Sequence, residues 1–387
     1  MFFHQRFVPG LAIASYLVGD EKTKRVAVID PTRDVDEYIR IASAEGLEIT
    51  DILETHVHAD FVSGARELMA RLNGEPMIHS SGMGGADWTP TYADHIVKDG
   101  DEIKLGDKVR LRAMHTPGHT PEHVSWALFD DSRSSDTPWL LFTGDFVFVG
   151  DVGRPDLLGD KERAELAHQL YESVFTRLAP LPDFTEIFPS HGAGSLCGKA
   201  IGSRRSSSLG FERKFNLSMR AKPEAEWAQT LLKGMPLAPP YFTRMKRINK
   251  EGPPILGAEL PGDRPISARE LASRITPSRG EGHSRSEGSS AQQTSSPALT
   301  QPLPAYRERS QSADEHGPII LDARSKEAFA SAHIPNSISI PIGPQLANWA
   351  GWVLPDDQPI VLVVADKEDL RETITQLIRV GFDRIDG

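Results

Sequence analysis

The sequence has a single cysteine and no long apolar run. Cys197 is the only cysteine among 387 residues, so no disulfide can form within the chain, and this fits a reducing compartment. No stretch reaches the roughly 18 consecutive apolar residues that a membrane-spanning helix needs. Residues 1–10 also lack the basic start and apolar run of a secretory signal. Together these absences predict a cytoplasmic protein that is not bound to a membrane.

The chain also lacks an excess of positive charge. Its 43 Lys and Arg residues are outnumbered by 54 Asp and Glu residues, which gives a net charge of −11. Nucleic acids and anionic membrane surfaces require a basic face, so neither is expected as a partner. A small anionic substrate in a local basic pocket remains compatible with this charge. The hydrophobic fraction of 39% is that of an ordinary globular protein, and the length allows roughly two to three domains.

Short β-like runs alternate with helical patterns through residues 1–200. Strands are predicted at residues 12–18, 25–30, 51–55, 77–79, 108–114, 124–128, 139–143 and 186–188. Helices are predicted at residues 34–45, 65–72 and 161–178. Strands interleaved with helices in this way are typical of a layered α/β domain.

A second ordered region follows a segment of biased composition. Residues 277–316 contain nine serines and no Val, Ile, Phe or Trp, so they cannot bury enough apolar surface to offset their ordering entropy. Residues 319–322 and 360–364 are apolar runs typical of buried parallel strands, and a helix is predicted at 369–380. The predicted organisation is a first domain at 1–250, a linker with a short helix at 251–276, a disordered insertion at 277–316 and a small α/β domain at 317–387.

Histidine and aspartate residues follow four of the predicted strands. They are His56, His58, Asp60, His119, Asp145 and His191. Strand ends at one edge of a sheet bring such side chains to a common point, and independent placement at four strand ends is improbable. Imidazole and carboxylate groups suit zinc and iron, whereas Cys197 lies outside these positions. The pattern therefore predicts a metal site without a thiolate ligand.

This pattern resembles the metallo-β-lactamase superfamily, whose motif is H-x-H-x-D-H. The resemblance covers about residues 1–250 and implies an αββα sandwich with its metal site at one edge of the two sheets. The chain departs from the motif at Phe61, where hydrolases of the family have a histidine that helps to hold a second metal. Phenylalanine has no lone pair, so a second metal would keep at most Asp60, Asp145 and His191. We therefore expect a single metal.

Further segments resemble the persulfide dioxygenase branch of this superfamily. They are His-Val-His-Ala-Asp at 56–60, Phe-Thr-Gly-Asp at 142–145, Gly-Arg-Pro-Asp at 153–156 and His-Gly-Ala-Gly-Ser at 191–195. The resemblance implies one Fe(II) per chain, held by His56, His119 and Asp145. Two imidazoles and one carboxylate leave positions open for substrate and O2.

The same resemblance implies roles for four other residues and a set of partners. His58, Asp60 and His191 would orient the ligands and bound water. Arg154 would contact an anionic substrate or form a salt bridge to Asp151 or Asp156. The implied reaction, part of hydrogen sulfide detoxification, converts a low-molecular-weight thiol persulfide such as glutathione persulfide, with O2 and water, to thiol and sulfite. A second copy of the chain and a sulfurtransferase are the other candidate partners.

The C-terminal region resembles a rhodanese, or sulfurtransferase, domain. The resemblance rests on Asp-Ala-Arg at 322–324 and Ala-His-Ile-Pro at 332–335, with residues 266–271 similar to the opening helix. Rhodanese chemistry needs a thiolate in the loop after a central strand. Residues 365–368 occupy that loop as Ala-Asp-Lys-Glu, and this region has no cysteine. We therefore expect a small α/β rhodanese-like domain that is catalytically silent.

Two other functions are compatible with these residues. A thioester hydrolase of the glyoxalase II kind would need two metals and a metal-activated hydroxide, against which Phe61 argues. Its reaction needs no O2, so an anaerobic assay separates it from a dioxygenase. A non-enzymatic sulfide-responsive scaffold built on two degenerate domains is the other, and it predicts no sulfite even with iron bound.

Overall fold

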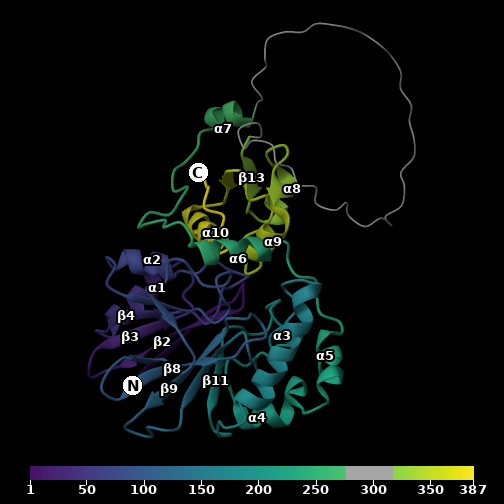
Figure 1. Cartoon of the computed structure of the whole chain (residues 1–387). Coiled ribbons are helices and arrows are strands. Elements are labelled where there is room, and N and C mark those ends of the chain that lie inside the picture. Colours follow the sequence, from purple (N-terminus) through teal and green to yellow (C-terminus); the bar gives the residue numbers. More distant parts are fainter. Residues whose placement is uncertain (276–316) are drawn as a thin grey trace.

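A computed structural model describes residues 1–275 and 317–387 of the chain, so the insertion predicted at 277–316 lies outside the described residues. The N-terminal part has four layers (Figure 1): two six-stranded sheets face each other, and helices cover both outer faces. The C-terminal part is smaller and contains a three-stranded sheet. In the described ranges, no helix combines the length and the apolar character needed to cross a bilayer.

The first sheet has the strand order β1-β2-β3-β4-β5-β6. Its strands are β1 (Phe2–Val8), β2 (Ile13–Asp20), β3 (Arg25–Ile29), β4 (Glu48–Leu53), β5 (Met77–Ser81) and β6 (His95–Val97). The first three pair antiparallel, and β3 to β6 are parallel neighbours. The helices α1 (Asp36–Ala44) and α2 (Ala65–Arg71) form the crossovers and cover the outer face. Sequence periodicity missed β1, because its mostly half-buried side chains show no alternation.

The second sheet has the order β12-β11-β10-β9-β8-β7. Its strands are β7 (Glu102–Lys104), β8 (Val109–His115), β9 (Val124–Asp130), β10 (Leu140–Gly144), β11 (Glu186–Pro189) and β12 (Ser207–Ser208). Helix α3 (Asp160–Glu172) lies between β10 and β11 in the chain, and α4 (Leu209–Phe215) and α5 (Glu224–Leu232) follow β12. Apolar residues of α3 and α5 pack on the outer face. A short π-helix, Ser173–Arg177, continues α3.

The core between the sheets is rich in aromatic side chains. Tyr16 and Phe142 lie 4.9 Å apart between ring centroids, Phe3 and Phe188 lie 4.8 Å apart, and Trp126 is fully buried beside them. Strands β2 and β9 are buried along their whole length, since one face meets the other sheet and the opposite face meets helices or loops. The αββα sandwich expected from the sequence is therefore confirmed.

The C-terminal sheet has the order β14-β13-β15, and both strand pairs are parallel. Its elements are β13 (Ile319–Asp322), α8 (Lys326–Ser331), β14 (Ile338–Ser339), α9 (Leu346–Val353), β15 (Ile360–Val363) and α10 (Lys367–Arg379), with α7 (Ala268–Ile275) before them. Residues 319–322 form the predicted buried strand, and 360–363 form its parallel neighbour. The chain returns beside this sheet at Ile385, which forms an isolated bridge to Ile360.

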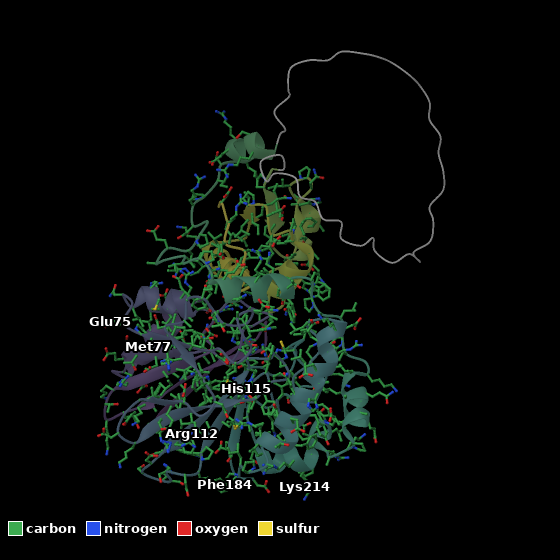
Figure 2. All side chains as sticks on the ribbon, in the orientation of Figure 1. Glu75, Met77, Arg112, His115, Phe184 and Lys214 are labelled. Atoms are coloured by element: carbon green, nitrogen blue, oxygen red, sulfur yellow. The ribbon has the colours of Figure 1, made fainter. Side chains whose placement is uncertain are left out.

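The C-terminal part packs on the sandwich through the helix α6 (Phe242–Glu251), which lies between the two parts in Figure 1. One apolar cluster contains Phe61 and Tyr241 together with Leu321 and Ile374, so the two parts share a core. At the opposite end of the sandwich, Phe184 and Lys214 lie far from the C-terminal part (Figure 2).

An ion pair reinforces this contact. Asp34 accepts hydrogen bonds from Arg379 at 2.9 and 2.6 Å, and from Arg6 on β1. Burial alone would raise the pKa of Asp34, but Arg379 and Arg6 outweigh it and lower the pKa to about 2. Because the folded-state pKa is depressed, this stabilisation is present above the ordinary aspartate pKa and is lost as the pH falls through about 2.

Asp34→Asn should therefore lower the free energy of unfolding by about 2 kcal/mol at neutral pH. The difference in the free energy of unfolding between wild type and variant should shrink toward zero as the pH falls from about 4 to 2, because the wild-type carboxylate also becomes neutral. Denaturant titrations of both proteins across that pH range measure this difference. A difference that stays constant with pH would contradict the assigned ion pair.

Candidate metal centre

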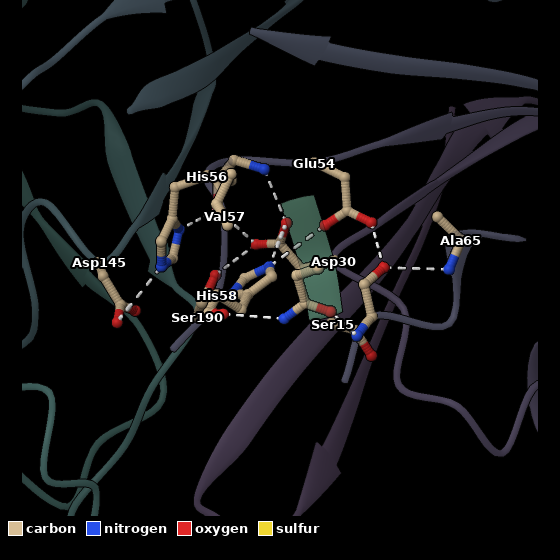
Figure 3. Close-up of polar contacts among 12 residues, drawn as sticks. Ser15, Asp30, Glu54, His56, Val57, His58, Ala65, Asp145 and Ser190 are labelled. Atoms are coloured by element: carbon tan, nitrogen blue, oxygen red, sulfur yellow. Dashed lines mark hydrogen bonds and ion pairs between the residues drawn. The ribbon is translucent and has the colours of Figure 1, made fainter. Parts of the chain in front are cut away.

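Three of the residues predicted as ligands converge at one point. His56 Nε2 lies 3.8 Å from Asp145 Oδ2, and His119 Nε2 lies 3.5 Å from the same oxygen. One ligand atom from each residue lies within 4.8 Å of the others, and all three side chains are buried. His56 and Asp145 face each other in Figure 3. The separations are those of atoms that can share one metal ion.

Strand ends and two glycines set these positions. His56 follows β4, and Asp145 follows Gly144 at the end of β10. Gly144 has φ +52°, and a Cβ there would lie 2.4 Å from His123 Nε2. Gly118, just before His119, has φ +139°, and its Cβ would lie 2.4 Å from Leu170 Cβ. Both turns thus require glycine, because any side chain would displace its neighbours.

Hydrogen bonds fix which imidazole nitrogens are free. His119 Nδ1 donates to the carbonyl of Arg154 at 3.0 Å, which leaves Nε2 with its lone pair. Thr55 Oγ1 donates to Asp30, so it accepts from His56 Nδ1 at 2.9 Å, and His56 Nε2 is likewise free. Such partners commonly orient metal-binding histidines.

The three facing atoms are His56 Nε2, His119 Nε2 and Asp145 Oδ2. All are buried, and none has a hydrogen-bond partner among the residues that the structure describes. Buried polar atoms are rarely left without partners, so three around one point fit a bound cation. This donor set of two imidazoles and a carboxylate suits iron or zinc.

The charge states also suit a metal. Burial lowers the pKa of both His56 and His119, which favours the neutral imidazole that binds metals. Burial alone would raise the pKa of Asp145, but the imidazoles around it, His191 first, hold it well below the usual value. Asp145 is therefore a carboxylate at neutral pH.

His191 bridges two of the predicted site carboxylates. Its Nδ1 lies 2.6 Å from Asp145 Oδ1, and its Nε2 lies 2.7 Å from Asp60 Oδ2. Burial lowers its pKa, but the two carboxylates outweigh this effect and raise the pKa to about 10. His191 is thus an imidazolium that donates to both carboxylates, and it leaves Asp145 Oδ2 directed at the ligand cluster. Cys197 lies beside it as a buried thiol whose pKa burial raises.

His58, the second histidine of the motif, lies in a different cluster. Its Nε2 is 3.2 Å from Asp30 Oδ1 and 3.3 Å from Glu54 Oε2, as Figure 3 shows. Burial lowers its pKa, but the two carboxylates outweigh burial and raise it well above the usual value. Sequence reasoning missed both carboxylates. The available signal was that each directly follows a strand, as Asp145 does.

Arg154 is buried, and its guanidinium has protein partners. It donates to Asp156 at 2.7 and 2.9 Å, and to the carbonyls of Leu196 and Pro236 at 3.0 and 2.8 Å. The salt bridge to Asp156 was one of the two roles considered from the sequence. An anion contact receives no support, because these bonds use four of the five N–H donors of the guanidinium. Arg154 acts on the centre through its carbonyl, which holds His119.

Comparisons with known proteins match both parts of the chain. A family model described as metallo-beta-lactamase superfamily matches residues 8–191, and one described as rhodanese-like domain matches residues 305–385. Persulfide dioxygenase ETHE1, mitochondrial, from Bos taurus is 30% identical over 206 residues, which cover 53% of this chain and 74% of that protein. The chain belongs to the metallo-beta-lactamase superfamily. It also carries a C-terminal rhodanese-like domain.

Other members of the superfamily are similar as well. Hydroxyacylglutathione hydrolase cytoplasmic from Arabidopsis thaliana is 33% identical over 177 residues, or 46% of this chain and 62% of that protein. The crystal structure of a metallo-beta-lactamase from Staphylococcus aureus has a TM-score of 0.76 and 34% identity, and covers 100% of this chain and 98% of that one. ETHE1 from Myxococcus xanthus has a TM-score of 0.54 and 27% identity, and covers 65% of this chain and 98% of that one.

Phe61, where the superfamily motif has a histidine, is fully buried. Its ring centroid lies 4.3 Å from that of His58, and it belongs to the core shared with the rhodanese-like domain. Asn249 on α6 fixes the loop of residues 58–63. Its side chain donates to the carbonyls of His58 and Phe61 and accepts from Ser63 N. No local sequence pattern identifies Asn249, because it lies far along the chain from the motif.

Proposed function

We propose that the protein is a persulfide dioxygenase with one Fe(II) per chain. Its substrate would be a low-molecular-weight thiol persulfide of the glutathione type. The observation that carries this proposal is the buried cluster of His56, His119 and Asp145, whose three facing atoms have no partner in the described ranges. Two imidazoles and one carboxylate on one side of an iron leave positions for two further ligands. The similarity to ETHE1 over residues of the same domain supports the same reaction class.

The reaction converts RSSH, O2 and water to RSH, sulfite and two protons. Bound Fe(II) would supply the positions at which sulfur and O2 meet. Around it, His191 holds a proton on Nε2 against Asp60, and Asp60 Oδ1 is buried without a hydrogen-bond partner in the described part of the chain. Asp60 is therefore placed to accept a hydrogen bond from the reacting water, while His191 keeps Asp145 in its orientation.

A thioester hydrolase is the second candidate. It is favoured by the similarity to a hydroxyacylglutathione hydrolase and by the presence of His58, Asp60 and His191. It requires a second metal near Asp60, Asp145 and His191. Phe61 offers no ligand there, and His58 Nε2 forms ion pairs with Asp30 and Glu54. The dioxygenase therefore accounts for more of these observations.

Paired assays with and without air decide between the candidates. Protein loaded with Fe(II) should form sulfite from glutathione persulfide in air and none without O2, and it should leave an acyl-glutathione intact in both. Hydrolysis of the acyl-glutathione at equal rates with and without O2 would refute the dioxygenase. No turnover of either substrate by iron-loaded protein would favour the scaffold considered from the sequence.

A further inference from the structure

Two buried carboxylates beside the candidate metal centre contact the Nε2 atom of the His58 imidazole. Its Nε2 lies 3.2 Å from Asp30 Oδ1 and 3.3 Å from Glu54 Oε2, and all three side chains are buried (Figure 3). Together they form a cluster separate from that of His56, His119 and Asp145. The second histidine of the motif is thus grouped with carboxylates and not with the candidate ligands.

Both carboxylates also accept hydrogen bonds from other residues. Asp30 accepts from Thr55 N at 2.7 Å, Thr55 Oγ1 at 2.8 Å and Ser190 Oγ at 2.6 Å. Glu54 accepts from Ser63 Oγ. Because these bonds hold the carboxylates in place, the carboxylates cannot follow the imidazole if it turns.

The faces of the His58 ring are packed as well. The ring centroid lies 4.2 Å from that of His56 and 4.3 Å from that of Phe61. A turn of His58 toward the metal would leave Asp30 and Glu54 buried beside each other without the imidazole that contacts both, which is costly. The contacts at the edge of the His58 ring and those at its faces therefore both oppose a turn of the ring toward the metal.

We propose that Glu54, acting with Asp30, keeps His58 out of the metal's ligand set and limits the centre to two imidazoles and one carboxylate. The importance of this for catalysis rests on the proposed function, since a third imidazole would take a position that the persulfide or O2 needs. Glu54 is a positioning residue. It is a better target for substitution than Asp30, because Asp30 also anchors Thr55 and Ser190.

The test counts metal-bound imidazoles with Zn²⁺ alone as a diamagnetic probe, by ¹⁵N NMR of histidine side chains. Wild type should show two metal-bound imidazoles, Glu54→Leu three, and Glu54→Leu with His58→Phe two again. Because the released His58 adds a ligand, Glu54→Leu should also bind Zn²⁺ at least about tenfold more tightly, and the second substitution should reverse this gain.

Two further variants keep the test decisive. Glu54→Gln keeps the side-chain shape, so it replaces Glu54→Leu if that variant does not fold, and it should change zinc affinity in the same direction. Asp51→Asn is the matched control, because Asp51 contacts His79 at 2.9 Å on the same sheet and should not alter the imidazole count.

Three results would overturn the inference. They are a metal-bound His58 in wild type, an unchanged count of two in the folded Glu54 variants, and a second zinc ion held by Asp30, Glu54 and His58. The count does not depend on turnover. Iron-loaded wild type with two bound imidazoles that forms no sulfite would therefore refute the proposed function and leave this inference standing.

Discussion

Replacing His119 with alanine should remove iron and sulfite formation together. His119 supplies one of the three unpartnered atoms of the cluster, and alanine offers no lone pair in its place. Loss of an outer partner of a metal ligand already costs about 10–100-fold in affinity, so loss of a ligand should cost more than about 100-fold. Iron content after anaerobic loading and sulfite formation from glutathione persulfide measure the two effects.

His115→Ala is the matched control for this variant. His115 lies at the end of β8, before the same turn, and contacts the carbonyl of Pro121 at 2.9 Å (Figure 2). The His115→Ala protein should keep one iron per chain and most of its sulfite formation. A His119→Ala protein that retains iron at the wild-type level would show that this cluster is not the metal site.

Replacing Phe61 with histidine should raise the metal content from one ion per chain to two. The introduced imidazole would join Asp60, Asp145 and His191, the groups left around the second position of the superfamily. Its polar ring would also replace a fully buried phenylalanine in the core shared with the rhodanese-like domain, so the variant should be less stable by about 2–4 kcal/mol. Elemental analysis after loading with excess metal gives the stoichiometry.

Phe61→Leu separates ligand chemistry from packing. Leucine disturbs the same core but has no lone pair, so this variant should keep a single metal ion. If Phe61→His also keeps one ion while folding normally, the residue at position 61 does not determine the number of metals. The expectation of a mononuclear centre would then lose its main support in the sequence.

The candidate ligands could be proposed from the sequence because each one lies at or shortly after the end of an apolar strand. His56 and Asp145 follow predicted strands, and strand ends at one edge of the sandwich must converge. Glu54 and Asp30 also lie at strand ends, but the sequence pattern places each of them inside its predicted strand. Asn249 could not be found, since its contacts with the motif loop depend on how α6 packs.

The contact between the two parts of the chain also could not be predicted from the sequence. Phe61 was identified from the motif as a missing ligand, and the structure adds that its ring lies in a core shared with Leu321 and Ile374. Val62 N donates to the carbonyl of Arg379 at 2.7 Å, which ties the motif loop to the end of α10. Such pairs are hundreds of residues apart, and no local pattern encodes them.

The central claim is a single iron ion that reacts with O2 at the cluster of His56, His119 and Asp145. Metal analysis of protein purified without air, followed in the same sample by O2 uptake on addition of glutathione persulfide, tests it most directly. The account predicts one iron per chain and one O2 consumed for each sulfite formed. Two zinc ions per chain, with no O2 uptake by the protein even after iron loading, would contradict it.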